Sequence, residues 1–590
     1  MELGVSLLSL LLRKVMTNDT RNSLTDFDMC LALTQQAINS QMEVAWDIWI
    51  ANSDFFDKFT RMEKKKFASL YIPDTESEGS GMKFELDPIK LNLNVTGTKL
   101  AQVEVTLPIK SITVYEEKDL TRKERRDMEK AVENCMREKQ ENLDDEDVFN
   151  KYAQQYKKDN RDQYFNEFYL TPFTISFLST IDQKKPSSES LKKMSFEDLD
   201  AVKKYKGEVN KASKYEFPDS VFSIEYLCMK FTDVDLVSNV SNDIPQDIPD
   251  KHSLKIRDSI SKLFNKNKTD FVFGKVVFCQ TQEYVPTFGL TDFSFHVKGN
   301  DDYKKASTLS YLGVFGEQEL PKKKKLDEAR NKLADNWIDS KKITGVDSSV
   351  SGLMAISKFV FFEKHILPGC TKELKVQPIK EEKGWKYELI PYEDCKSRND
   401  IVNAKYLIKV TAWLKIKPKP QTNEIEIEGK IETTANYDSW VIGLKSLGRE
   451  SWIRLAGFQT FNATIRLKDS GGTEKFQINT ETSKDIKFSE VTVEKEEVQG
   501  LAKLTKNKDS FASEAFKILM AQKTANETIA DLQKKNREMM KTAIKNNLKT
   551  IDMSLAEKSF IPPGRGVFTF QTPSFSYAGD LLFDVIYKTP

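Results

Sequence analysis

Hydrophobic and polar residues alternate along many stretches of the chain, and this period of two predicts antiparallel β-strands. The alternation begins at residue 82 and runs through 84–86, 89–95, 103–109 and 112–114. It returns in "EFYLTPFTISFLSTI", "SVFSIEYLCMKFTDVDL", "DFVFGKVVFCQ" and "YVPTFGLTDFSFHVKG", and beyond residue 400 in "AKYLIKVTAWLKIK", "NEIEIEGKIETT" and "NATIRLKDSGGTEKFQINTET". Successive side chains of a strand point to opposite faces, so each strand has an apolar face that must be covered.

Other stretches have the spacing of three to four residues that is typical of helices. The segment "SLTDFDMCLALTQQAINSQMEVAWDIW" places Phe27, Leu31, Thr34 and Ile38 on one helical face. The segment "SGLMAISKFVFFEKHILPG" predicts a second helix, which a Pro-Gly pair stops. Between them, residues 321–350 are polar and are predicted to form a loop.

The longest helix is predicted near the C-terminus, over residues 510–556. Apolar residues recur there every three or four positions, and no proline or glycine interrupts them before Pro562 and Gly564. At about 1.5 Å per residue this helix would be roughly 65–70 Å long, which requires an elongated body as its partner. Pro562, Pro563 and Gly564 are predicted to end the helix sharply, so that residues 566–588 can form the last strands.

Residues 116–165 are densely charged with both signs mixed. This composition is typical of a solvated helical insertion that is held by charge pairs four residues apart. The alternative interpretation is an arm that binds a partner protein.

Composition narrows the class of protein. The chain has 590 residues, 39% hydrophobic and 11% aromatic, which is enough for large cores and argues against disorder. The net charge of +1 gives no general case for nucleic acid binding. The six cysteines form no C-x-x-C pair, so buried reduced thiols are expected.

The N-terminal stretch "MELGVSLLSLLLRKVM" does not have the pattern of a signal peptide. Glu2 stands where a signal peptide has Lys or Arg, and the apolar run over residues 5–12 is too short to span a bilayer. We therefore expect no signal peptide and no transmembrane helix, and a protein that is cytoplasmic or secreted by a non-classical route.

The sequence contains no common catalytic or phosphate-binding motif. It lacks G-x-x-x-x-G-K-[ST], G-x-G-x-x-G, H-E-x-x-H and G-x-S-x-G. The three histidines, His252, His296 and His365, have no second His or Cys at ligand spacing. A catalytic site assembled from distant residues leaves no such motif, but the prediction is a protein without catalytic residues, metal or cofactor.

Four stretches resemble a known family. They are "TDFDMCLALTQQAINSQM", "ASTLSYLGVFGEQELP", "GLMAISKFVFFEKHILP" and "SFIPPGRGVFTFQTPSFSYAGDLLFDVIY". In this order they are similar to the OrfX-type accessory proteins encoded beside clostridial neurotoxins, which include a forty-seven-kilodalton relative and belong to the tubular lipid-binding (TULIP) superfamily. The opening stretch departs from the family pattern, because "SLTDFD" replaces an aromatic-rich segment.

The resemblance implies a bacterial protein of α+β class with an elongated TULIP-like architecture. Strongly curved, long antiparallel sheets would wrap around long helices, including the helix near 510–556. The N-terminal TULIP-like half would span residues 1–300 with the charged insertion near 116–165. The C-terminal half would span 301–590 with the long helix and the closing strands 566–588.

The resemblance also implies a function: non-enzymatic binding of a lipid or another amphipathic hydrophobic ligand in an elongated groove. The alternative is a toxin-accessory or assembly scaffold with a filled core, which would contact a toxin complex component or a second copy of itself. A secreted virulence factor is implied by family context alone. Nucleic acid is not expected as a partner, and membrane contact would be at most peripheral. The candidate groove residues are Leu91, Leu93, Val95, Val103, Val105, Phe293, Phe295, Ile425, Ile427, Ile529, Leu532, Met539 and Ile544.

Overall fold

The structure is a computed structural model of the whole chain. The residues it describes are 24, 26–52, 68–73, 80–94, 102–185, 196–230, 244–246, 248–266, 271–279, 286–300, 304–316, 318–322, 324–333, 350–368, 377–381, 384–388, 395–398, 402–441, 451–469, 477–482, 487–489, 492–499, 534, 538, 541, 542, 546, 550–564 and 566–589.

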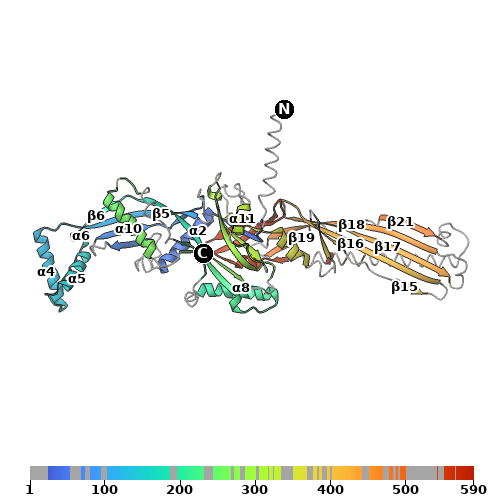
Figure 1. Ribbon diagram of the computed structural model, residues 1–590, viewed down its shortest axis with the longest axis horizontal. Helices are drawn as coiled ribbons and strands as arrows, with labels where there is room; N and C mark the ends of the chain where they lie inside the picture. Colours follow the sequence, from blue (N-terminus) through green and yellow to red (C-terminus); the bar gives the residue numbers. More distant parts are fainter. Residues whose placement is uncertain are drawn as a thin grey trace, which may run out of the picture.

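The molecule is elongated and is built on antiparallel sheets that follow one another along its long axis (Figure 1). Among the described residues there are three sheets, of nine, six and ten strands. The nine-stranded sheet occupies one end, the six-stranded sheet the middle, and the ten-stranded sheet the other end. The expected α+β class with long antiparallel sheets is confirmed.

The nine-stranded sheet contains most of the strands predicted between residues 68 and 279. Its longest strand, β5, alternates buried and partly exposed residues along most of its length, as an antiparallel strand with one covered face does. The sheet has the order β2-β3-β5-β7-β8-β9-β23, with β4 and β6 also paired to β5. Its strands are β2 (Ala68–Pro73), β3 (Gly81–Leu86), β4 (Lys90–Asn92), β5 (Gln102–Glu117), β6 (Phe165–Leu170), β7 (Phe173–Lys184), β8 (Phe222–Lys230), β9 (Phe271–Cys279) and β23 (Phe560–Ile561).

The six-stranded sheet collects strands from distant parts of the sequence. Its order is β10-β11-β1-β12-β25-β24, so the first described strand lies between strands from the middle of the chain, and the last two strands complete one edge. The strands are β1 (Met29–Thr34), β10 (Leu290–Lys298), β11 (Thr308–Phe315), β12 (Gly352–Ile356), β24 (Val567–Phe575) and β25 (Leu581–Lys588). The predicted closing strands at 566–588 are therefore present.

The ten-stranded sheet is built on three long neighbouring strands, β16, β17 and β18, which run toward the far end of the molecule (Figure 1). Its other strands are shorter and pair along or beside them. The bounds are β13 (Gln377–Glu381), β14 (Gly384–Glu388), β15 (Cys395–Arg398), β16 (Val402–Pro418), β17 (Glu424–Val441), β18 (Ser451–Asp469), β19 (Gln477–Thr482), β20 (Lys487–Phe488), β21 (Thr492–Gln499) and β22 (Thr550–Asp552).

Helices join and cover these sheets. The insertion predicted at 116–165 is helical, as expected, and forms the hairpin of α4 (Arg122–Glu138) and α5 (Glu146–Asp159), followed by α6 (Arg161–Tyr164). The other helices are α2 (Gln35–Asn52), α8 (Phe196–Ser213), α10 (Asp250–Lys266), α11 (Lys324–Lys332), α16 (Ser554–Lys558), short 3₁₀ turns at Asp219–Val221 and Lys304–Ala306, and a π-helix at Phe359–Ile366.

Strands β1, β11 and β12 of the six-stranded sheet are buried on both faces. On one face Met29, Leu31 and Leu33 of β1 join the main apolar core, which extends through all three sheets. On the other face Cys30 and Ala32 join a smaller core with Ala329 and Leu333, from α11 and the residue that follows it.

Two helix predictions and one loop prediction are wrong in part. The segment around Phe27 and Leu31 is not helical from its start, because residues 29–34 form strand β1 and the helix begins at Gln35. Likewise residues 352–356 form strand β12, and only residues 359–366 form a helix, of the π type. The polar stretch 321–350 contains a helix, α11, where a loop was predicted.

The long helix predicted at 510–556 falls mainly outside the described residues. The described positions 534, 538, 541, 542 and 546 are helical. Its predicted C-terminal end is wrong, because residues 550–552 form strand β22, followed by the short helix α16. Pro562 and Pro563 therefore follow strand β23, and Gly564 makes a turn at a φ of 67°.

Two further predictions concern the domain boundary and the N-terminal apolar run. The predicted boundary between residues 300 and 301 lies in the connection between β10 and β11, which pair along their length. The six-stranded sheet contains strands from both sides of that boundary. The division into two halves stays a prediction. The apolar run at residues 5–12 lies outside the described residues.

Candidate functional site

The predicted groove residues that the structure describes belong to one apolar core. Leu91, Leu93, Val103 and Val105 come from the nine-stranded sheet, Phe293 and Phe295 from the six-stranded sheet, and Ile425 and Ile427 from the ten-stranded sheet. All eight side chains are buried. The remaining five candidates, Val95, Ile529, Leu532, Met539 and Ile544, lie outside the described residues.

Helix α2 covers the part of this core that lies in the nine-stranded sheet. The Asn39 amide accepts a hydrogen bond from the Leu91 N–H at 2.7 Å and donates one to the Leu91 carbonyl at 3.1 Å. Gln35 Oε1 accepts a further bond from the Leu93 N–H at 2.9 Å. These side chains satisfy backbone groups that would otherwise be buried without partners, so α2 is fixed over β4.

Aromatic rings fill the space between α2 and β9. The ring centroids of Trp46 and Trp49 are 5.3 Å apart, and Phe271 lies 5.7 Å from Trp49. All three side chains are buried. Tilted and edge-on contacts at these separations are favourable packing geometries, so this part of the interior is a packed core.

The long strands of the ten-stranded sheet have an apolar inner face with varied side-chain sizes. Ile425 pairs with Ile465, Ile427 with Ala463, and Gly429 with Phe461. A Cβ atom at Gly429 would lie 2.1 Å from the Phe461 ring, so the glycine makes room for that ring. Two of these three pairs thus join a large residue to a small one, and the ring of Phe461 occupies part of the inner face.

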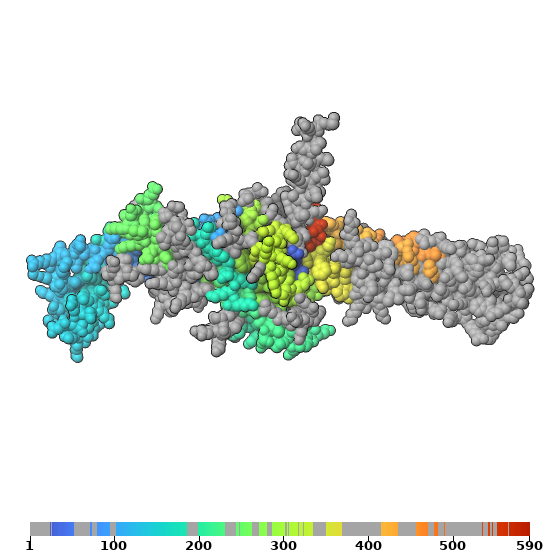
Figure 2. Space-filling view, in the orientation of Figure 1, coloured from blue at the N-terminus to red at the C-terminus, as the bar shows by residue number. Residues whose placement is uncertain are grey.

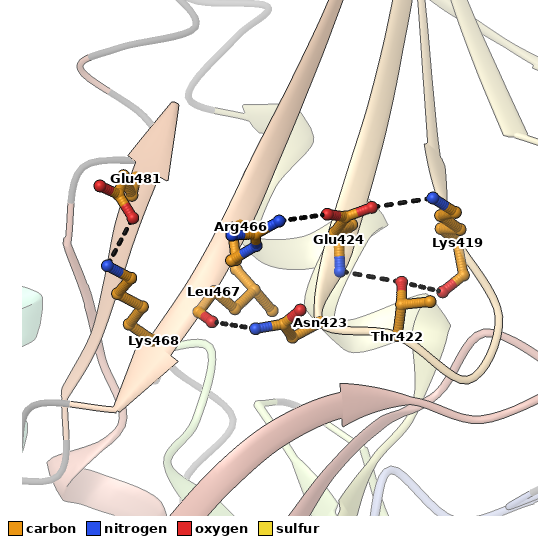
Figure 3. A network of polar contacts seen from close by, with 8 residues as sticks. All are labelled: Lys419, Thr422, Asn423, Glu424, Arg466, Leu467, Lys468 and Glu481. Carbon is orange, nitrogen blue, oxygen red and sulfur yellow. Dashed lines mark hydrogen bonds and ion pairs between the residues drawn. The ribbon is translucent and has the colours of Figure 1, made fainter. Parts of the chain in front are cut away.

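The outer face of the same strands carries a paired network of charges (Figure 3). Glu424 contacts Lys419 and Arg466, each at 2.9 Å, and Lys468 contacts Glu481 at 2.5 Å. Hydrogen bonds from Lys419 and Arg466 lower the pKa of the Glu424 carboxyl. The ribbon of strands is therefore apolar inside and polar but internally neutralised outside.

Two buried carboxylates, which we did not predict as functional, link the ends of strands in the six-stranded sheet. Asp28 Oδ2 accepts a hydrogen bond from the Phe315 N–H at 2.9 Å, and Asp580 Oδ1 accepts one from the Lys358 N–H at 2.8 Å. Burial raises the pKa of each carboxyl to about 6. Their sequence signal is an aspartate beside long apolar runs, in "TDFDMCLAL" and "AGDLLFDV".

The histidines occupy separate environments. His252 Nε2 lies 3.0 Å from Glu116 Oε1 on the nine-stranded sheet. His296 is buried on β10, where burial, together with Lys298 and Arg330, lowers its pKa to about 4. His365 lies against the ring of Phe288 at 4.8 Å. Within the described ranges no group of three His, Cys, Asp or Glu residues could hold a metal ion.

Two other expectations concern thiols and membranes. Cys30, Cys228 and Cys279 are free and buried, and Cys135 is free and partly exposed, as expected for reduced thiols. No helix in the described part of the chain has the length and apolar character that crossing a bilayer requires.

These features define an elongated α+β protein in which curved antiparallel sheets share one apolar interior. Solved structures that are similar to this chain include P47 of Clostridium botulinum E1, which aligns with 95% of this chain and 98% of its own at 9% identity and a TM-score of 0.42. P47 of Clostridium botulinum A2 aligns with the same coverage and identity at a TM-score of 0.45. At this similarity the likeness describes the fold only. No protein-family model and no curated protein matches the chain.

Proposed function

We propose that this protein binds the apolar chains of a lipid or another amphipathic molecule, without catalysis, along the inner faces of its sheets. The observation that supports this function best is the main apolar core, which extends through all three sheets of an elongated molecule. An acyl chain on such a surface leaves water, which is favourable by about 25 cal/mol per Å².

The ten-stranded sheet is the part of the molecule that we propose for the ligand. There the inner face includes the small residue Ala463, which pairs with Ile427 on the neighbouring strand and lies two residues from Ile465 on its own strand. The outer charges are already paired with one another, so the headgroup is expected to remain at the end of the ribbon, in water.

The test is native mass spectrometry of the full-length purified protein, followed by organic extraction and identification of any lipid. We expect a stoichiometric phospholipid or fatty acid in the parent protein. Ile427→Trp places a large ring opposite Ala463 and should abolish lipid retention, as should Leu93→Trp if the ligand extends into the nine-stranded sheet.

The matched control is Glu428→Trp, which adds the same ring to the next residue of β17 on the opposite face of the sheet. It should retain the lipid. Circular dichroism verifies that each variant is folded, and Ala463→Leu provides a smaller change if Ile427→Trp does not fold. A parent mass without ligand that no lipid mixture shifts would contradict the proposal, as would equal retention in the inward and outward variants.

A second candidate function is an assembly scaffold that acts through protein contacts. The packed rings of Trp46, Trp49 and Phe271 favour it, because the protein itself occupies the interior between α2 and β9. Light scattering of the purified chain would detect a homodimer. A dimer without bound lipid would favour this function over lipid binding.

A further inference from the structure

Helix α4 begins with a row of cations on one face. Arg122, Arg126 and Lys130 are four residues apart, so their side chains lie one above another along the helix. Lys123 lies beside them, and all four side chains are exposed. The apolar residues Met128, Val132 and Met136 point to the opposite side, into a small core of their own.

The spacing of these cations is unfavourable for the helix, although Asp127 and Glu129 lie beside them on α4. Like charges four residues apart repel each other, and cations in the first turns interact unfavourably with the positive end of the helix dipole. Helix α5 of the same hairpin shows the favourable arrangement, with Glu146 and Asp147 in its first turn and Lys157 and Lys158 in its last. The cations of α4 therefore occupy positions that are unfavourable for the stability of the helix start.

No carboxylate in the described part of the chain pairs with the row. Glu124 is engaged in the capping box, where its carboxylate accepts hydrogen bonds from the Thr121 N–H at 2.8 Å and the Thr121 hydroxyl at 2.7 Å. The row ends where Glu133 pairs with Arg137 at 3.6 Å. Four exposed cations are thus available for an anion from outside the chain.

The hairpin lies where a large external surface can reach it. It projects from one end of the elongated molecule (Figure 2). Its foot is held firmly, because the Arg161 guanidinium lies 4.4 Å from the ring centroid of Tyr71 and 4.9 Å from that of Tyr115. The hairpin is therefore attached to the nine-stranded sheet at Tyr71 of β2 and Tyr115 of β5.

We propose that this cation row docks the end of the molecule on an anionic membrane surface. Exposed aromatic residues near the foot of the hairpin favour a membrane over other polyanions: on β6 Tyr169 is 75% exposed and Phe168 is 39% exposed. Cations with neighbouring aromatic side chains are typical of proteins that bind the bilayer interface. The net charge of +1 gives no general attraction to an anionic surface, so a local group of cations must supply it. This surface contact does not require a lipid in the interior.

The experiment is flotation of the full-length protein with phosphatidylcholine vesicles, with and without phosphatidylserine. We expect binding only to vesicles that contain phosphatidylserine, and weaker binding as salt is added. The triple variant Arg122→Gln, Arg126→Gln and Lys130→Gln should bind these vesicles on the order of 100-fold more weakly, since each cation near an anionic leaflet contributes about fivefold.

A matched control removes the same charge elsewhere. Lys151→Gln, Lys158→Gln and Lys203→Gln change three exposed lysines outside the row, and this variant should bind like the parent. The melting temperature of the α4 variant should equal or exceed that of the parent, because repulsion is relieved, so unfolding would not explain a loss of binding.

Three outcomes would overturn the proposal. They are no binding of the parent to anionic vesicles, equal losses in the α4 and control variants, and binding of a DNA duplex that depends on the row while vesicles do not bind. The last result would assign the row to nucleic acid instead.

Discussion

At the residue scale, the buried acid Asp580 should make the protein less stable as pH rises. Its folded pKa is raised from 3.8 to about 6 by burial, so its contribution to stability is complete below 3.8 and is lost as pH rises through 6. The shift corresponds to about 3 kcal/mol at most. Asp580→Asn keeps an acceptor for the Lys358 N–H. In urea unfolding it should be more stable than the parent at pH 7.5 and nearly equal at pH 4.

The buried histidine His296 should have the opposite effect over an overlapping range. Its folded pKa is lowered from 6.5 to about 4, so its contribution is complete above 6.5 and is lost as pH falls toward 4. The two groups therefore oppose each other in the parent. His296→Gln should leave a protein that gains stability on acidification, whereas Asp580→Asn should leave one that loses it. Parallel pH profiles for the two variants would contradict both assignments.

The residue-scale predictions from sequence were accurate where one face of a strand is covered. Val103 and Val105 alternate with partly exposed residues, and both are buried as expected. The sequence could not tell whether these apolar positions line a space or fill a core. That depends on which side chains from distant elements meet them, such as Trp46 and Phe271, which are more than two hundred residues apart along the chain.

At the element scale, the errors have a common cause. Strands β1 and β12 are buried at every position, so their apolar residues do not alternate with polar ones. A continuous apolar run followed by a helix has the same spacing as a longer helix, and we interpreted both segments that way. The two strands lack the usual alternation of apolar and polar residues because both of their faces are covered. The covering elements, α11 on one face and the main core on the other, come from distant parts of the sequence.

The pairing of β17 with β18 should depend on the absence of a side chain at Gly429. Its Cβ would collide with the Phe461 ring, so Gly429→Ala should lower the free energy of unfolding by about 1–3 kcal/mol. Adding Phe461→Leu should recover much of this loss, because the smaller side chain vacates the ring position. Thermal or urea unfolding of the single and double variants would measure the coupling.

The control for this prediction is another glycine. Gly207 lies in α8, and a Cβ there would meet no atom within 4 Å. Gly207→Ala should be neutral or stabilising, since alanine is the better helix former. Equal losses at the two glycines would show that the contact with Phe461 is unimportant.

At the scale of the whole molecule, the six-stranded sheet makes the two ends of the chain interdependent. Strand β1 lies between β11 and β12, and β12 pairs with β25 near the C-terminus. Hydrogen bonds between distant segments reinforce this, such as the one from the Thr34 hydroxyl to the Ser351 carbonyl at 3.0 Å. Neither end can complete its core without the other.

We therefore expect that residues 1–300 and 301–590, produced separately, will not fold as two independent units. The cut would separate β10 from β11 and remove both neighbours of β1, which exposes Met29, Leu31 and Leu33. Each half should be aggregated or lack a cooperative thermal transition, while the full chain shows one. Two soluble monomers, each with a sharp transition of its own, would instead support two sequential halves that fold separately. Calorimetry of both fragments and the full chain distinguishes these results, because an interdependent fold loses its unfolding enthalpy when the central sheet is divided.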